Sequence, residues 1–235
     1  MQIGGVQKLT LIDFPGKLAC TVFLAGCNFF CPWCYSRELV LPQESKKLPE
    51  FSEKDFFDFL KERKGLLEGV TICGGEPTTN RDLPEFISRI RDLGYAVKLD
   101  TNGSDPMMLA VLIEEKMLDY VAMDVKLPFE RYPEVCYTQE GAFNVQQSIN
   151  LLKENKVDYE FRTTVVSNVH TAEDILSIVR WISPAKRYFL QNFRPEKTVD
   201  PDFEKVVPYT QEFLADIQKK IEPFFDVCQV RTLGN

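Results

Sequence analysis

Short apolar segments alternate with helix-like segments along most of this 235-residue chain, and that alternation limits the fold more than any other feature. Strands are expected at 18–24, 70–73, 95–99, 120–123, 159–166 and 187–190. Between them, apolar side chains recur at the helical spacing, as with Ile175, Ile178 and Val179. A strand–helix unit repeated about six times predicts an α/β protein with a parallel sheet. The pattern fits a partial (β/α)6, TIM-like barrel, and a doubly wound open sheet is the alternative.

Two further segments flank this predicted core. Residues 8–23 are predicted to form two strands, because Pro15-Gly16 favours a turn and Leu9 and Leu11 alternate with polar residues. Towards the other end, a last helix and a final strand at 227–230 are expected. No linker or repeat interrupts the chain, which predicts one domain, 1–235. It has three parts: an N-terminal hairpin at 1–17, a core at about 18–195 and a C-terminal extension at 196–235.

Composition excludes several classes of partner and location. The formal net charge of -7 disfavours binding to a nucleic-acid backbone. No run of eighteen apolar residues exists, so no transmembrane helix is expected. The first residues lack the basic and apolar blocks of a signal peptide, and the seven cysteines form no disulfide-scaffold pattern. We therefore expect a cytoplasmic protein that binds neither nucleic acid nor membrane.

Three of the cysteines, Cys27, Cys31 and Cys34, stand close together with the spacing C-x3-C-x2-C. Soft thiolates this close usually bind zinc or an iron–sulfur cluster. A tetrahedral zinc site needs a fourth ligand, and the only histidine, His170, is far away in sequence. A [4Fe–4S] cluster held by three cysteines leaves one iron open, which suits catalysis better than a structural role. A structural zinc or a redox loop stays as the alternative.

Polar motifs follow four other predicted strands, where a barrel enzyme keeps its active site. They are Gly74-Gly75-Glu76-Pro77, Asp100-Thr101-Asn102-Gly103, Asp124-Val125-Lys126 and Gln191. Each has an ordinary reading when taken alone, as a tight turn or a solvated ion pair. Their recurrence at successive strand ends favours a shared site.

Together, the cysteine spacing and the Gly-Gly-Glu-Pro loop resemble the radical S-adenosylmethionine (radical SAM) enzymes. In that family the open iron is chelated by the amino and carboxylate groups of S-adenosylmethionine, and the Gly-Gly-Glu-Pro backbone binds the methionine amino group. The resemblance therefore implies a partial (β/α)6 barrel, a [4Fe–4S] cluster and S-adenosylmethionine as cofactors. No second cysteine cluster exists, so no auxiliary cluster is predicted, and the remaining cysteines are interpreted as small buried hydrophobes.

Residues 3–18 narrow the resemblance to activating proteins for anaerobic ribonucleoside-triphosphate reductase. The motifs at 100–103, 123–126, 162–165 and 191–193 match that group too, and they also resemble the pyruvate formate-lyase activating enzyme. The likeness covers about residues 3–195. It implies that a flavodoxin- or ferredoxin-type reductant feeds the cluster. Reductive cleavage of S-adenosylmethionine would then give a 5′-deoxyadenosyl radical that makes a glycyl radical on a partner enzyme.

The resemblance also assigns roles to individual residues. The cluster is expected to be bound by Cys27, Cys31 and Cys34. The residues expected to contact S-adenosylmethionine are Trp33 (beside the adenine), Gly74, Gly75, Glu76, Pro77, Asn102, Asp124, Lys126, Arg162 and Gln191. A monovalent cation site falls to Asp100, Thr101 and Asp124. His170 is expected to have no part in the chemistry.

Two positions depart from that group, and two rival functions remain. Tyr35-Ser36 stands where the group usually has His-Asn, and Phe30 stands where it usually has Arg. Both positions lie by the cluster, so they put the identity of the partner in doubt more than the chemistry. One rival is a radical SAM enzyme acting on a small molecule, such as a 7-carboxy-7-deazaguanine synthase. The other is a non-enzymatic iron–sulfur protein that transfers electrons.

Overall fold

A computed structural model of the chain describes residues 1–48, 51–136 and 140–231. Its centre is one eight-stranded sheet in which the strands lie side by side in chain order. The strands are β1 (Ile3–Thr10), β2 (Ala19–Leu24), β3 (Gly69–Gly74), β4 (Ala96–Thr101), β5 (Tyr120–Asp124), β6 (Asp158–Val165), β7 (Ala185–Asn192) and β8 (Phe225–Arg231). β1 pairs antiparallel with β2, and every other neighbouring pair is parallel.

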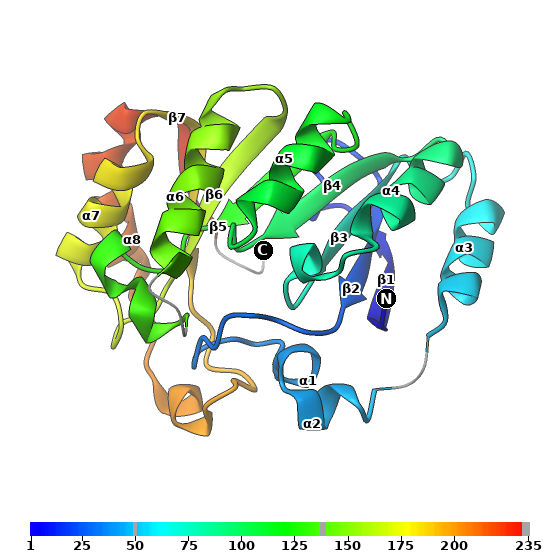
Figure 1. The fold of residues 1–235 in the computed structure, drawn as a ribbon. Helices are drawn as coiled ribbons and strands as arrows, with labels where there is room; N and C mark the ends of the chain where they lie inside the picture. The colour runs from blue at the N-terminus through cyan, green and yellow to red at the C-terminus, as the bar shows by residue number, and fades with distance from the viewer. Residues whose placement is uncertain (49–50, 137–139, 232–235) are drawn as a thin grey trace.

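The helices are α1 (Arg37–Val40), α2 (Pro42–Ser45), α3 (Glu53–Glu62), α4 (Leu83–Asp92), α5 (Pro106–Glu114), α6 (Glu140–Lys153), α7 (Ala172–Ile182) and α8 (Gln211–Ile221). Helices α3 to α8 cover the outer side of the curved sheet, whereas α1 and α2 lie apart from them, in the segment between β2 and α3 (Figure 1). Parallel crossovers are almost always right-handed, so strands in sequential order place α3 to α8 on one face. This arrangement confirms the partial barrel, open between β1 and β8, and does not match a doubly wound sheet.

The N-terminal hairpin exists, but its first strand lies earlier than predicted. β1 begins at Ile3, and Leu9 and Leu11 are 56% and 76% exposed, so their alternation does not mark a buried face. The Thr10 hydroxyl accepts hydrogen bonds from the backbone N–H groups of Ile12 and Asp13. This local turn bends the chain away from the sheet edge, where β1 has only one neighbouring strand.

The C-terminal extension contributes to the same sheet. The predicted final strand is confirmed as β8, which pairs with β7 and adds a seventh parallel strand to the predicted six. Within the described residues, no helix is long and apolar enough to cross a membrane. The cytoplasmic location and the three-part division of the chain remain predictions.

Candidate cluster and cofactor site

A cavity of about 290 Å³ opens where the parallel strands end. All of the predicted site residues line it except Pro77, which instead begins a short 3-10 helix at Pro77–Thr79. The residues it brings together are Cys27, Cys31, Trp33, Cys34, Gly74, Gly75, Glu76, Asp100, Thr101, Asn102, Asp124, Lys126, Arg162 and Gln191. Residues spread over most of the chain therefore meet in one cavity because their loops follow parallel strands.

The three clustered cysteines are held in the loop after β2. Cys31 is buried, Cys27 and Cys34 are partly exposed, and all three line the cavity. Burial raises the pKa of the Cys27 thiol to about 11 and that of Cys31 to about 12. Binding of a metal would therefore displace protons from these thiols. Among the residues that the structure describes, no three Cys, His, Asp or Glu side chains are arranged to hold a single metal ion.

Gly74 and Gly75 allow the loop after β3 to lie directly against the cysteine loop. Gly74 has a φ of +128°, and a Cβ atom there would overlap the backbone of Leu24. A Cβ atom on Gly75 would overlap the carbonyl group of Gly26. The contact is fixed by hydrogen bonds from Gly75 N to Leu24 O, at 2.9 Å, and from Glu76 N to Gly26 O, at 2.7 Å. The glycines thus set the distance between two walls of the cavity.

Glu76 joins the loop after β3 to the loop after β4. Its buried carboxylate accepts hydrogen bonds from Thr101 Oγ1 at 2.7 Å and from Asn102 N at 2.6 Å, besides two from Thr78. Burial raises the pKa of this carboxyl group, although the hydrogen bonds lower it. In this structure the side chain of Glu76 therefore orients its neighbours, and its predicted contact to a methionine amino group remains a prediction.

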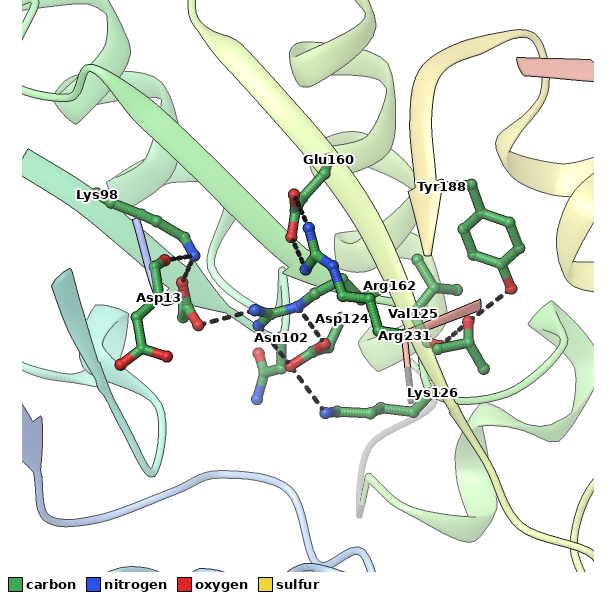
Figure 2. Close-up of polar contacts among 12 residues, drawn as sticks. Asp13, Lys98, Asn102, Asp124, Val125, Lys126, Glu160, Arg162, Tyr188 and Arg231 are labelled. Carbon is green, nitrogen blue, oxygen red and sulfur yellow. Dashed lines mark hydrogen bonds and ion pairs between the residues drawn. The ribbon is translucent and has the colours of Figure 1, made fainter. Parts of the chain in front are cut away.

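Charged side chains of alternating sign form a row along the inner face of the sheet (Figure 2). We call this set the charge row, and it consists of Lys98, Asp100, Arg162, Asp124 and Lys126. Arg162 binds Asp124 through Nε and Nη2, at 2.9 and 3.2 Å, and Asp100 through Nη1 at 2.9 Å. Lys126 Nζ lies 3.2 Å from Asp124 Oδ2.

Two members of the charge row, Asp124 and Lys126, stay ionised in their buried setting. Burial alone would raise the pKa of Asp124, but Arg162 and Lys126 outweigh it and hold that pKa at about 2. Burial alone would lower the pKa of Lys126, but Asp124, Cys31 and Cys34 outweigh burial and raise that pKa above its usual value. The ammonium group therefore stays charged. The predicted cation ligands Asp100 and Asp124 are thus both paired with Arg162, and the cation site remains a prediction.

Trp33 and His170 support the site from behind. His170 is buried; its Nδ1 accepts a hydrogen bond from Val166 N and its Nε2 lies 2.8 Å from Lys126 O. Trp33 lines the cavity, but its ring also packs edge-on against His170 at 5.9 Å and against Phe203 at 6.2 Å. Trp33 therefore acts as core packing here, and its contact to adenine remains a prediction.

The sequence analysis missed several residues of the site. Cys73, interpreted as a small buried hydrophobe, lines the cavity. Arg194 also lines it, and its backbone N–H donates to Tyr35 Oη at 2.7 Å. Tyr35 was noted only as a departure, and the signal for Arg194 was its position just after the Gln191 strand end.

The segment after β7 holds the cysteine loop in place. The N–H groups of Val199 and Asp200 donate to the carbonyl groups of Cys34 and Pro32, at 3.0 and 2.9 Å. Tyr35 stacks on Phe193 with ring centroids 5.6 Å apart. Part of the C-terminal extension therefore belongs to the cysteine site, although the sequence analysis separated the two.

Known proteins with similar sequences identify the family to which this chain belongs. The sequence profile of the radical SAM superfamily matches residues 21–182. The chain belongs to the radical SAM superfamily. Membership implies a [4Fe–4S] cluster and S-adenosylmethionine, and a cavity lined by three cysteines next to the Gly-Gly-Glu loop fits both groups.

Relatives of this radical SAM protein differ in how much of it they match. A provisionally named glycyl-radical enzyme activating enzyme of Methanocaldococcus jannaschii is 33% identical over 99% of this chain and 96% of its own length. A 7-carboxy-7-deazaguanine synthase of Methanopyrus kandleri is 32% identical, but over only 52% of this chain and 57% of its own. The likeness to the activating enzyme thus extends over far more of the chain.

Solved structures share the fold of this radical SAM protein. Streptococcus suis SuiB superposes with a TM-score of 0.66 at 15% identity, over 91% of this chain and 48% of SuiB. The chain thus spans about half the length of that structure. At this identity the likeness shows the fold alone.

Proposed function

We propose that this radical SAM protein is an activase that generates a glycyl radical on a partner enzyme, most specifically an anaerobic ribonucleotide reductase. The observation that carries the proposal is the cavity in which Cys27, Cys31 and Cys34 meet the loops after β3, β4 and β5. The relative that matches 99% of the chain supports the activase class. The resemblance of residues 3–18 supports the choice of reductase.

The role of each residue would follow from its position in the cavity. Cys27, Cys31 and Cys34 would hold the cluster, and when bound the cluster and S-adenosylmethionine supply a reductively generated organic radical. Lys126 and Arg162 place positive charge on the cavity wall, which suits the carboxylate of S-adenosylmethionine. Backbone hydrogen bonds join the loops that form the cavity walls, and this packing would limit the access of water to the reacting groups when the cofactors are bound.

Other assignments extend the same proposal. The backbone of Gly74 and Gly75 would bind the amino group of S-adenosylmethionine, with Asn102 and Gln191 beside it. The ring of Trp33 would lie by the adenine. A flavodoxin- or ferredoxin-type protein would supply electrons, and oxygen atoms of Asp100, Thr101 and Asp124 would bind a monovalent cation when the cofactor is present.

The first test is anaerobic cleavage of S-adenosylmethionine. Wild-type protein reconstituted with iron and sulfide should release 5′-deoxyadenosine, and the triple variant Cys27→Ala/Cys31→Ala/Cys34→Ala should fall to background. With anaerobic ribonucleotide reductase present, the wild type should also produce the glycyl-radical EPR doublet. Cleavage without the doublet would reject this partner and keep the radical SAM chemistry.

A small-molecule enzyme is the second candidate, because 7-carboxy-7-deazaguanine synthases match parts of the chain. The same reconstituted protein can be offered a purine-like heterocycle in place of the reductase. Turnover of this small molecule with no protein partner would favour this candidate. A wild-type protein with a full cluster that releases no 5′-deoxyadenosine under any condition would contradict both enzyme functions.

A further inference from the structure

Lys98 is a buried cation that the sequence analysis passed over. It lies in the middle of β4, two residues before Asp100, so both side chains point to the inner face of the sheet. Its side chain is 3% exposed, and its Nζ lies 3.3 Å from Asp100 Oδ1. Nζ also donates a hydrogen bond to the backbone carbonyl of Asp13. A lysine this deeply buried needs partners, and these two supply them.

Asp100 is shared between two cations. Its Oδ2 accepts a hydrogen bond from Arg162 Nη1 at 2.9 Å. Its Oδ1 is buried and accepts no hydrogen bond from the residues that the structure describes, so the nearby charge of Lys98 is what balances it. Lys98 thus lies beside one oxygen atom of Asp100 and Arg162 beside the other.

Arg162 in turn depends on both of its carboxylate partners. Its guanidinium group is planar and rigid, with Nε and Nη2 on Asp124 and Nη1 on Asp100 (Figure 2). If Asp100 turned so that both of its oxygens faced Arg162, the guanidinium group would be drawn away from Asp124. Arg162 lines the cavity, and its partner Asp124 also binds Lys126. A shift of Arg162 would therefore displace Lys126 on the cavity wall as well.

We propose that Lys98 is a positioning residue for the cofactor cavity, acting through Asp100 and Arg162 on the Asp124–Lys126 pair. The inference rests on the proposed binding of S-adenosylmethionine and goes beyond it, because Lys98 does not line the cavity.

The test measures equilibrium binding of S-adenosylmethionine to reconstituted protein under anaerobic conditions. Lys98→Met should weaken binding about tenfold, which corresponds to about 1.4 kcal/mol. Because Lys98 acts through Asp100, the same substitution should change binding less than about twofold in an Asp100→Asn background. Arg187→Met is the matched control: the guanidinium group of Arg187 and the ammonium group of Lys98 both lie 5.8 Å from the ring centre of Tyr120. This control should bind S-adenosylmethionine as the wild type does.

Three results would overturn the proposal. Lys98→Met could bind S-adenosylmethionine as tightly as the wild type, Arg187→Met could lose as much affinity, or the loss could persist unchanged in the Asp100→Asn background. If Lys98→Met does not fold, Lys98→Gln replaces it with the same expectations, because the amide can still donate to the Asp13 carbonyl. A wild type that binds no S-adenosylmethionine would sink the proposed function as well, whereas normal binding by the wild type and by Lys98→Met would sink only the role of Lys98.

Discussion

At the residue scale, two adjacent glycines decide how closely the walls of the cavity approach. A side chain on Gly74 would overlap the backbone of Leu24 at the end of β2, and one on Gly75 would overlap the backbone of Gly26 in the cysteine loop. Backbone atoms cannot move aside as the end of a flexible side chain can, so the overlap must be relieved by separating the two loops. The loop after β3 therefore serves the site through the absence of side chains as much as through the groups that it presents.

We expect Gly75→Ala to destabilise the fold by about 3 kcal/mol and to reduce cluster loading, because the new Cβ meets the Gly26 carbonyl group. Gly5→Ala is the matched control, since nothing lies within 4 Å of a Cβ at that position. Urea unfolding gives the stability, and iron content after reconstitution gives the loading. Equal behaviour of the two variants would show that the close approach at Gly75 is not required.

At the element scale, the loops after β5 and β6 are joined through His170. The ring accepts a hydrogen bond from Val166 N and contacts Lys126 O, so it requires a neutral imidazole with its proton on Nε2. A proton on Nδ1 would face the N–H group of Val166. The lone histidine, for which no role was predicted, therefore holds the loop that carries Lys126.

The fold should lose stability on acidification because of His170. Burial lowers the pKa of this imidazole, and Arg131 adds to that effect. The backbone hydrogen bonds and Asp174 raise the pKa, but their effects are weaker. The unfolded chain has a histidine pKa of about 6.5 and takes up the proton first as the pH falls, so the loss begins there and continues to the lower folded pKa. Above that range both states are neutral and His170 contributes no pH dependence.

The measurement is urea unfolding at pH 7.5 and at pH 5.5, for the wild type and for His170→Asn. We expect the wild type to lose about 1 kcal/mol more than the variant over this interval. An identical loss in the two proteins would show that other groups account for the acid sensitivity.

At the scale of the whole molecule, an ion pair with a buried carboxylate ties the last strand to the centre of the sheet. Arg231, on β8, donates two hydrogen bonds to Glu160 on β6, at 2.6 and 2.8 Å, and β7 lies between the two strands. The side chain of Glu160 is 1% exposed, and Tyr120 on β5 donates to it at 2.8 Å. Together, Tyr120, Glu160 and Arg231 thus connect β5 to β8 in the open barrel.

Arg231→Met should destabilise the fold by about 3 kcal/mol, because it leaves a buried carboxylate without its cation. The double variant Glu160→Gln/Arg231→Met should regain much of that loss. Arg180→Met serves as the control, because Arg180 pairs with Glu173 at the surface and exposed pairs contribute about 1 kcal/mol or less. Urea unfolding measures all three, and equal losses for the two single arginine variants would contradict a special role for the buried pair.

The sequence by itself determined the class of fold and most of the residues that meet in the cavity. The spacing of apolar residues identified the strands and helices, and their alternation implied a parallel sheet, because each depends on local patterns. The cysteine spacing and the polar strand ends pointed to one cavity for the same reason. The first strand of the hairpin was predicted too late in the chain. This strand, β1, lies at the edge of the sheet with a neighbour on one side only, so its apolar pattern is weaker.

Only the tertiary structure decided which side chains meet inside that frame. Lys98 and Arg162 both contact Asp100, yet they lie 64 positions apart and on strands separated by β5. Val199 reaches the cysteine loop from the far end of the chain. Such contacts depend on the order and register of the strands and on where loops fold back, and no local pattern of residues encodes them.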